Sequence, residues 1–128
     1  MISMEFDEAF LYDILAILKV KLIKTAYSDV TAYDNYQSFT MRLLERCPKH
    51  QAILKSTEFS DLVFANLAIF ERIDEMKKKT PTGEDAIFID SMNYKRFLYK
   101  KALQEKFFPN EKLTEQKFGY DKNNTISQ

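Results

Sequence analysis

Apolar residues recur along this chain at intervals of three and four, which is the spacing of one face of an α-helix. The pattern predicts five helical segments, which span residues 4–26, 31–47, 48–56, 58–79 and 84–107. Thr82 and Asp85 have the spacing of a capping box and favour a helix start there. Thr31 and Asp34 repeat that spacing near the start of the second segment. We therefore expect an all-α fold, a bundle of four longer helices and one short helix.

Individual residues also mark the boundaries between the segments. Pro48 can begin a helix but cannot continue one, and the stretch TPTG at 80–83 interrupts the periodicity. We expect residues 1–108 to form one bundle domain, with helix 4–26 at its centre because that segment is apolar on nearly every side. Residues 109–128 form a polar tail. Three apolar side chains could fasten this tail to the bundle: Leu113, Phe118 and Tyr120.

The composition narrows the class of protein without indicating a function. Only 2 glycines and 3 prolines are present, too few for the many turns of an all-β protein. The 19 basic and 19 acidic residues cancel, so no overall field attracts nucleic acid or an anionic membrane. One cysteine cannot form an internal disulfide, and the N-terminus has acids where a signal peptide has basic residues. The most apolar stretch, 9–23, is too short and too charged to span a bilayer. We expect an intracellular, cytoplasmic protein.

The only cysteine and the only histidine lie four positions apart, in the stretch RCPKH at 46–50. Cys47 falls on the apolar side of helix 31–47, where a free cysteine behaves as a small buried hydrophobe. His50 lies beyond Pro48, after the chain changes direction, and no third group nearby is expected to orient its imidazole. A zinc site would need further ligands. The pattern therefore favours a helix corner over a catalytic pair.

The apolar side of helix 31–47 is predicted to comprise Ala32, Tyr33, Tyr36, Phe39, Thr40, Leu43, Leu44 and Cys47.

Two pairs of acids have the i, i+3 spacing seen in metal-dependent nucleotide hydrolases. They are Glu5 with Glu8, and Glu71 with Asp74. Acids near a helix N-terminus also complement the helix dipole, and acids elsewhere commonly lie on a solvated face. The sequence has no further nucleophile, metal-ligand cluster or glycine-rich phosphate loop. We therefore expect a protein that is not an enzyme and needs no cofactor, with the hydrolase as a remote alternative.

Asp13 and Asn66 are polar residues in apolar surroundings. Asp13 has Phe6, Ala9, Phe10 and Ile17 as helical neighbours, so it lies either at the edge of the apolar wall or beside a partner within the bundle. Asn66 lies in the middle of the apolar stripe of helix 58–79. We expect it to make a buried hydrogen bond, to Asp13 or to a tyrosine hydroxyl, and to restrict register or oligomeric state.

Helix 84–107 presents the reverse case, an aromatic side chain on a polar face. Its apolar side is predicted to comprise Ile87, Phe88, Met92, Tyr94, Leu98, Tyr99, Ala102 and Leu103. Phe97 points elsewhere, among Arg96, Lys100 and Lys101, and Phe108 returns to the same face. Phe64 has similar charged surroundings on helix 58–79. Aromatic anchors ringed by basic groups are typical of interface centres, so we expect this patch to bind a partner.

These observations predict a small non-enzymatic helical protein that acts through protein–protein contacts, as an adaptor, inhibitor or regulator. An acidic protein surface would complement the basic and aromatic patch, and a homo-oligomer is also expected. Single-stranded nucleic acid is the alternative partner, since aromatic stacking combines with Lys or Arg in such sites. No membrane association is expected.

Overall fold

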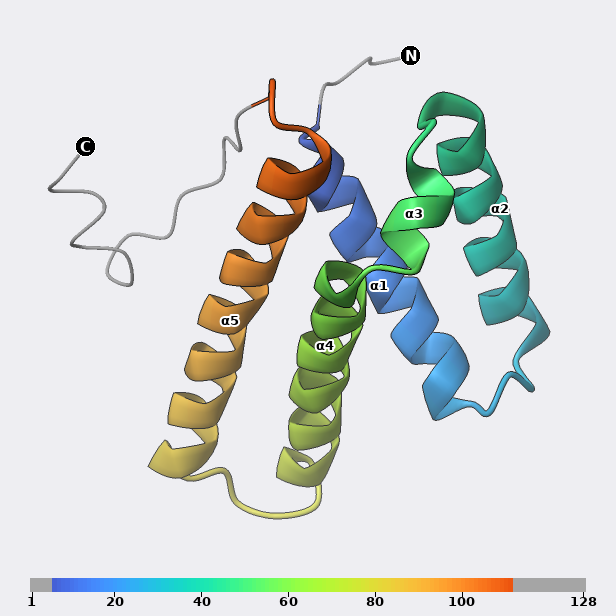
Figure 1. Ribbon diagram of the computed structural model, residues 1–128. Coiled ribbons are helices and arrows are strands. Elements are labelled where there is room, and N and C mark those ends of the chain that lie inside the picture. The colour runs from blue at the N-terminus through green and yellow to red at the C-terminus, as the bar shows by residue number, and fades with distance from the viewer. Residues whose placement is uncertain (1–5, 112–128) are drawn as a thin grey trace, which may run out of the picture.

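Residues 6–111 are described by the structure, a computed structural model, and they fold into helices joined by short turns (Figure 1). This part of the chain contains no strand. The predicted all-α bundle of four longer helices and one short helix is confirmed. The helices are α1 (Glu8–Lys24), α2 (Val30–Arg46), α3 (His50–Leu54), α4 (Thr57–Met76) and α5 (Gly83–Phe107).

The helices begin where the sequence provides a hydrogen-bonding oxygen. The predicted capping box of α5 is present, because the Asp85 carboxylate accepts from the Thr82 amide at 2.9 Å and the Thr82 hydroxyl accepts from the Asp85 amide at 3.4 Å. The predicted start of α2 at Thr31 is wrong. Asp29 caps this helix instead, with its carboxylate 3.1 Å from the Ala32 amide. Asp29 offers an equivalent oxygen two residues earlier, so Thr31 already lies inside the helix.

α1 lies in the middle of the molecule, as predicted. Figure 1 shows α4 and α5 as an antiparallel pair on one side of α1, with α2 and α3 on the other side. α1 packs against α2, α4 and α5, and α3 packs against α2 and α4. No helix within residues 6–111 is both long and apolar enough to cross a membrane.

The main core forms where α1 meets all its neighbours, and a smaller cluster forms between α4 and α5. The main core contains buried side chains from every helix: Ala9, Tyr12, Leu15, Ala16, Leu43, Ile53, Phe59, Leu62, Leu103 and Phe107. The smaller cluster contains Ala65, Ile69 and Met92. α2 contributes only one buried side chain, Leu43, and is therefore the most loosely packed of the long helices. The predicted contacts of Leu113, Phe118 and Tyr120 lie outside the described residues.

The turn after α1 has an unusual backbone. The Tyr27 amide donates to the Leu22 carbonyl at 2.8 Å and the Ala26 amide to the Ile23 carbonyl at 3.1 Å, which is the Schellman pattern. That pattern requires positive φ, and Ala26 has φ 51° while Tyr27 has φ 64°. Glycine normally occupies the first of these positions because a Cβ atom disfavours the left-handed region.

We expect Ala26→Gly to raise the free energy of unfolding by about 1 kcal/mol, because glycine adopts the positive φ of this position without a Cβ penalty. Urea denaturation followed by far-UV circular dichroism measures the change. Ala102→Gly, at an exposed position inside α5, is the matched control and should lower stability by about 0.5–1 kcal/mol. A loss of stability in Ala26→Gly similar to that in the control would contradict the strain at this turn.

Candidate functional site

The patch predicted on α5 is not an exposed surface. Phe97 is only 4% exposed, and Lys100 is also buried. Phe108 is partly buried and packs against the main core. Arg96 binds a carboxylate inside the bundle, and Lys101 is only partly exposed. The prediction that Phe97 lies on a solvated face is therefore wrong, and this patch offers no aromatic anchor to a partner.

The reason is that Arg96 and Gln104, two polar residues of α5, face α1 instead of solvent. The Gln104 side chain accepts from the Ala9 amide at 2.9 Å and donates to the Glu8 carboxylate at 2.7 Å. Phe97 lies two turns before Gln104 on the same side of the helix, and it is buried with it. Helical periodicity separates polar from apolar positions, but it does not tell a solvated polar face from one that meets polar groups of another helix.

Asp13 is the centre of a polar network that joins three helices. The Asp13 carboxylate accepts two hydrogen bonds from Arg96 of α5, from Nε at 3.0 Å and from Nη2 at 2.6 Å. It also accepts from Nδ2 of Asn66 in α4 at 3.0 Å. The same Asn66 group donates to the Leu62 carbonyl at 2.9 Å, and Arg96 donates to Asn93 at 3.2 Å. A two-point guanidinium–carboxylate pair is among the strongest polar contacts in proteins.

The predictions for these two residues have different outcomes. The buried hydrogen bond between Asn66 and Asp13 is confirmed. Two positions were considered for Asp13. The prediction that it lies at the edge of the apolar side of its helix is wrong, and the prediction that it has a partner within the bundle is correct. The sequence interpretation missed Arg96 as that partner, because it assigned Arg96 to a binding surface. A buried carboxylate on a central helix was itself the signal that some basic residue must point inward.

The imidazole at the Cys47–His50 corner is held by hydrogen bonds that the sequence did not predict. His50 is only 2% exposed, and both ring nitrogens have hydroxyl partners: Nδ1 lies 2.8 Å from the Tyr12 hydroxyl and Nε2 lies 2.7 Å from the Thr40 hydroxyl. The expectation that nothing orients this imidazole is therefore wrong. Cys47 is a free, partly buried thiol that packs against the main core. Because the imidazole already uses both nitrogens, it is held as a structural link between α1, α2 and α3.

Protonation at this corner follows from burial. Burial lowers the pKa of His50, so its imidazole is neutral and can donate through one nitrogen and accept through the other. Burial, and then the neighbouring Cys47 thiol, raise the pKa of the Tyr12 hydroxyl, which keeps its proton. Both groups are thus in the form that the two hydrogen bonds require.

Two carboxylates considered for a hydrolase, Glu8 and Asp74, have separate partners within the described residues. Glu8 accepts from Gln104, and Asp74 pairs with Lys24 at 2.5 Å. Glu5 lies outside the described residues. Within residues 6–111, no group of three or more Asp, Glu, His or Cys side chains is arranged to hold a metal ion.

α2 carries an apolar surface that the sequence interpretation missed. We call it the α2 stripe; it comprises Val30, Tyr33, Met41 and Leu44. Val30 is 71% exposed and Met41 is 52% exposed. Tyr33 and Leu44 were predicted to face the core and are exposed instead, because α2 packs on the core along another side, through Tyr36, Phe39 and Leu43. The apolar side of α2 is therefore wider than its contact with α1. Phe64, on α4, is exposed as expected.

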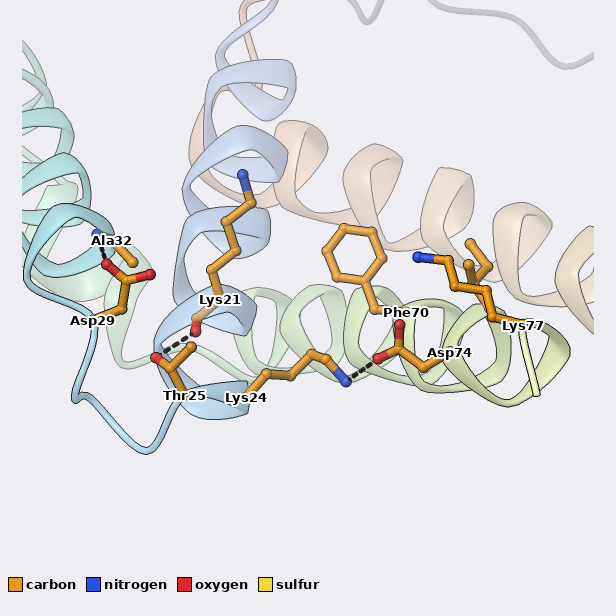
Figure 2. Close-up of a pocket in the computed structure, with 9 residues that line it drawn as sticks. Lys21, Lys24, Thr25, Asp29, Ala32, Phe70, Asp74 and Lys77 are labelled. Atoms are coloured by element: carbon orange, nitrogen blue, oxygen red, sulfur yellow. Dashed lines mark hydrogen bonds and ion pairs between the residues drawn. The ribbon is translucent and has the colours of Figure 1, made fainter.

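An open groove lies over the last turns of α1, between the start of α2 and the end of α4 (Figure 2). Its volume is about 430 Å³. Its apolar lining comes from Ala32, Phe70 and Ile73, and its basic groups are Lys21, Lys24 and Lys77. Neither this groove nor the α2 stripe includes any residue of the predicted α5 patch.

Replacing Arg96 by Met should lower the free energy of unfolding by about 3 kcal/mol, because the Asp13 carboxylate would stay buried without its countercharge. Lys101→Met makes the same chemical change at a partly exposed position of α5 and should change stability by less than about 0.5 kcal/mol. Combining Asp13→Asn with Arg96→Met removes both charges and should recover at least half of the loss. Thermal and urea denaturation measure all three variants. Similar losses in Arg96→Met and Lys101→Met would refute a central role for the network.

His50 should titrate below its ordinary pKa of 6.5 in the folded protein, because burial disfavours the imidazolium. Between these two pKa values the unfolded chain binds the extra proton, so stability should fall as pH decreases below about 6.5. Since His50 is the only histidine, its ring proton signals in NMR report this titration without overlap. A midpoint at or above 6.5, or a His50→Gln variant with the same pH dependence of stability as the wild type, would contradict the expected burial effect.

Comparison of this chain with known proteins identifies no relative. The chain matches no protein-family model, no curated protein and no solved structure. The functional conclusions therefore depend on the surfaces and contacts described above.

Proposed function

We propose that this chain is a non-enzymatic helical protein that acts by binding another protein, and that the α2 stripe is the contact surface. The observation that carries the proposal is the exposure of Val30, Tyr33, Met41 and Leu44 along one side of a single helix. Single exposed apolar residues are common on protein surfaces, whereas several of them on one face of a helix are a feature of interaction sites.

The spacing of the α2 stripe supports contact with an extended partner surface. Val30 and Tyr33 are three positions apart, Met41 and Leu44 are three apart, and Gln37 lies between the two pairs on the same side of α2. The two ends of the stripe, Val30 and Leu44, are fourteen positions apart, which corresponds to about 21 Å of helix. This row has the geometry with which one helix packs against another.

The division of α2 into three sectors favours a protein over a nucleic acid. One sector packs on α1, the stripe is apolar, and the remaining sector holds the exposed polar residues Asp34, Ser38, Arg42 and Glu45. The stripe contains no basic residue to neutralise phosphates. The alternative nucleic-acid hypothesis relied on Phe97 and Arg96 of α5, which are buried and bound to Asp13, respectively.

We also propose that this chain is not an enzyme. This proposal is supported by the structural partners of the most reactive groups: His50 is bound by Tyr12 and Thr40, and Asp13 is bound by Arg96. The stripe fits either a different protein or a second copy of this chain, and the homo-oligomer expected from the sequence is the second case. Measurement of mass in solution separates the two.

Met41→Asp should weaken partner binding at least about tenfold, because it places a charge on the apolar surface of the α2 stripe. Ser38→Asp introduces the same side chain into the polar sector of α2 and should leave binding unchanged. A photo-crosslinking residue at position 41, with position 38 as the matched control, identifies the occupant in extracts of the source cell. Light scattering on the purified chain reports self-association.

The proposal predicts a crosslinked protein, or a dimer of this chain, that depends on position 41. It would be abandoned if the chain stayed monomeric and positions 41 and 38 gave the same crosslinks. Equal far-UV spectra and melting temperatures for the two Asp variants would show that a loss of binding is not a loss of folding.

A further inference from the structure

The groove of Figure 2 is separate from the α2 stripe and has a different chemistry. It is bounded by three helix ends: the last turn of α1, the first turn of α2 and the last turns of α4. Phe70, Ile73 and Ala32 are each partly buried and line the groove. Figure 2 shows the Phe70 ring beside Asp74 and Lys77 on α4, with Lys21 on α1 across from them. The result is an apolar surface with ammonium groups at its margin.

The charges of the groove are only partly balanced within the described residues. Lys24 is paired with Asp74, and Asp29 is occupied as the cap of α2. Lys21 and Lys77 make no ion pair within residues 6–111. The Lys24 hydrogen bond and then the charges of Lys77 and Lys78 lower the pKa of Asp74, so the positive field of these lysines extends across this end of the molecule.

Helix-dipole complementation accounts for some of these lysines but not for the groove. A lysine near the C-terminus of α1 or α4 is favourable by itself. However, α1 and α4 end on the same side of the molecule, so their lysines converge on one apolar surface that no side chain of residues 6–111 fills (Figures 1 and 2). An exposed apolar surface with a basic margin is complementary to a ligand that carries both an apolar group and negative charge.

The wall formed by the α1–α2 turn is held in place before any ligand binds. The Thr25 hydroxyl donates to the Lys21 carbonyl at 2.9 Å, and the Ser28 hydroxyl donates to the Thr25 carbonyl at 2.6 Å. The Schellman hydrogen bonds of Ala26 and Tyr27 add to this restraint. A preformed wall loses little conformational entropy on binding.

We infer that this groove binds an acidic segment of a partner protein, with an apolar side chain against Phe70 and Ile73 and flanking carboxylates beside Lys21 and Lys77. Because the groove is open to solvent, it would cover only part of a small free anion, whereas a peptide chain continues beyond it on both sides. The inference does not depend on the α2 stripe, since the two surfaces share no residue.

The test uses the full chain and a fluorescein-labelled synthetic peptide that carries one Leu-Phe pair between acidic pairs. A peptide with two serines in place of Leu-Phe and an acidic-to-basic version are its controls. Fluorescence anisotropy gives the affinity, and amide NMR shifts locate the site. We expect saturable binding that weakens with salt, shifts at the ends of α1 and α4 and at the start of α2, and little binding of either control peptide.

Two sets of variants test the assigned residues. Lys21→Gln with Lys77→Gln should weaken binding about tenfold, whereas the same exchange at two exposed lysines elsewhere, Lys55 and Lys95, should not. Ala32→Glu should abolish binding, because it adds bulk and negative charge inside the groove while an acid in the first turn of α2 remains favourable for the helix.

Several outcomes would overturn the inference. One is the absence of saturable binding at millimolar peptide. Another is an equal loss in the Lys21/Lys77 and Lys55/Lys95 pairs, which would indicate unspecific charge attraction. Tighter binding of a labelled single-stranded oligonucleotide through the same lysines would assign the groove to nucleic acid instead. Failure of the α2 stripe experiments leaves this test unchanged, because none of these variants alters the stripe.

Discussion

One buried carboxylate determines how the three central helices can be arranged. An unpaired charge in the core would cost more free energy than most single interactions return, so the fold requires a partner for Asp13. Arg96 and Asn66 supply that partner from α5 and α4. Sliding either helix along α1 by one turn, about 5.4 Å, would break the contact. Apolar packing alone tolerates such a shift more easily, because many apolar side chains fit a neighbouring position nearly as well. We therefore expect the network to favour one register of these helices.

Much of the fold could be predicted from local features of the sequence. The 3.6-residue periodicity, Pro48 and the TPTG stretch define all five helices to within a few residues. The capping box of Thr82 and Asp85 was visible in the spacing alone, and so was the anomaly of Asn66 in an apolar stripe. These features could be predicted because each depends only on the residues of one helix or one helix end. The cap of α2 was assigned to Thr31, and Asp29 was overlooked although its side chain can supply the same oxygen.

The candidate sites were harder to predict, because they depend on which helices meet. Arg96 and Gln104 have the pattern of a solvated face, yet both reach α1. Tyr33 and Leu44 have the pattern of a core face, yet α1 is too narrow to cover them. The groove has no signature in any single segment, since Lys21, Ala32 and Phe70 come from three helices. Periodicity describes each helix by itself, and the functional surfaces arise from pairs and triplets of helices.

α2 lies at the periphery of the fold and is attached less firmly than α1, α4 and α5. The Asp13 network joins α1, α4 and α5 and includes no residue of α2. α2 is attached by one buried side chain, a few partly buried ones and the Thr40–His50 contact. Among the long helices, α2 should therefore detach at the lowest cost in free energy, and its detachment would leave the other three associated. Such an opening would also remove the wall that Ala32 gives the groove. A partner that binds α2 and holds it against α1 would therefore stabilise both surfaces at once, with no change in the arrangement of α1, α4 and α5.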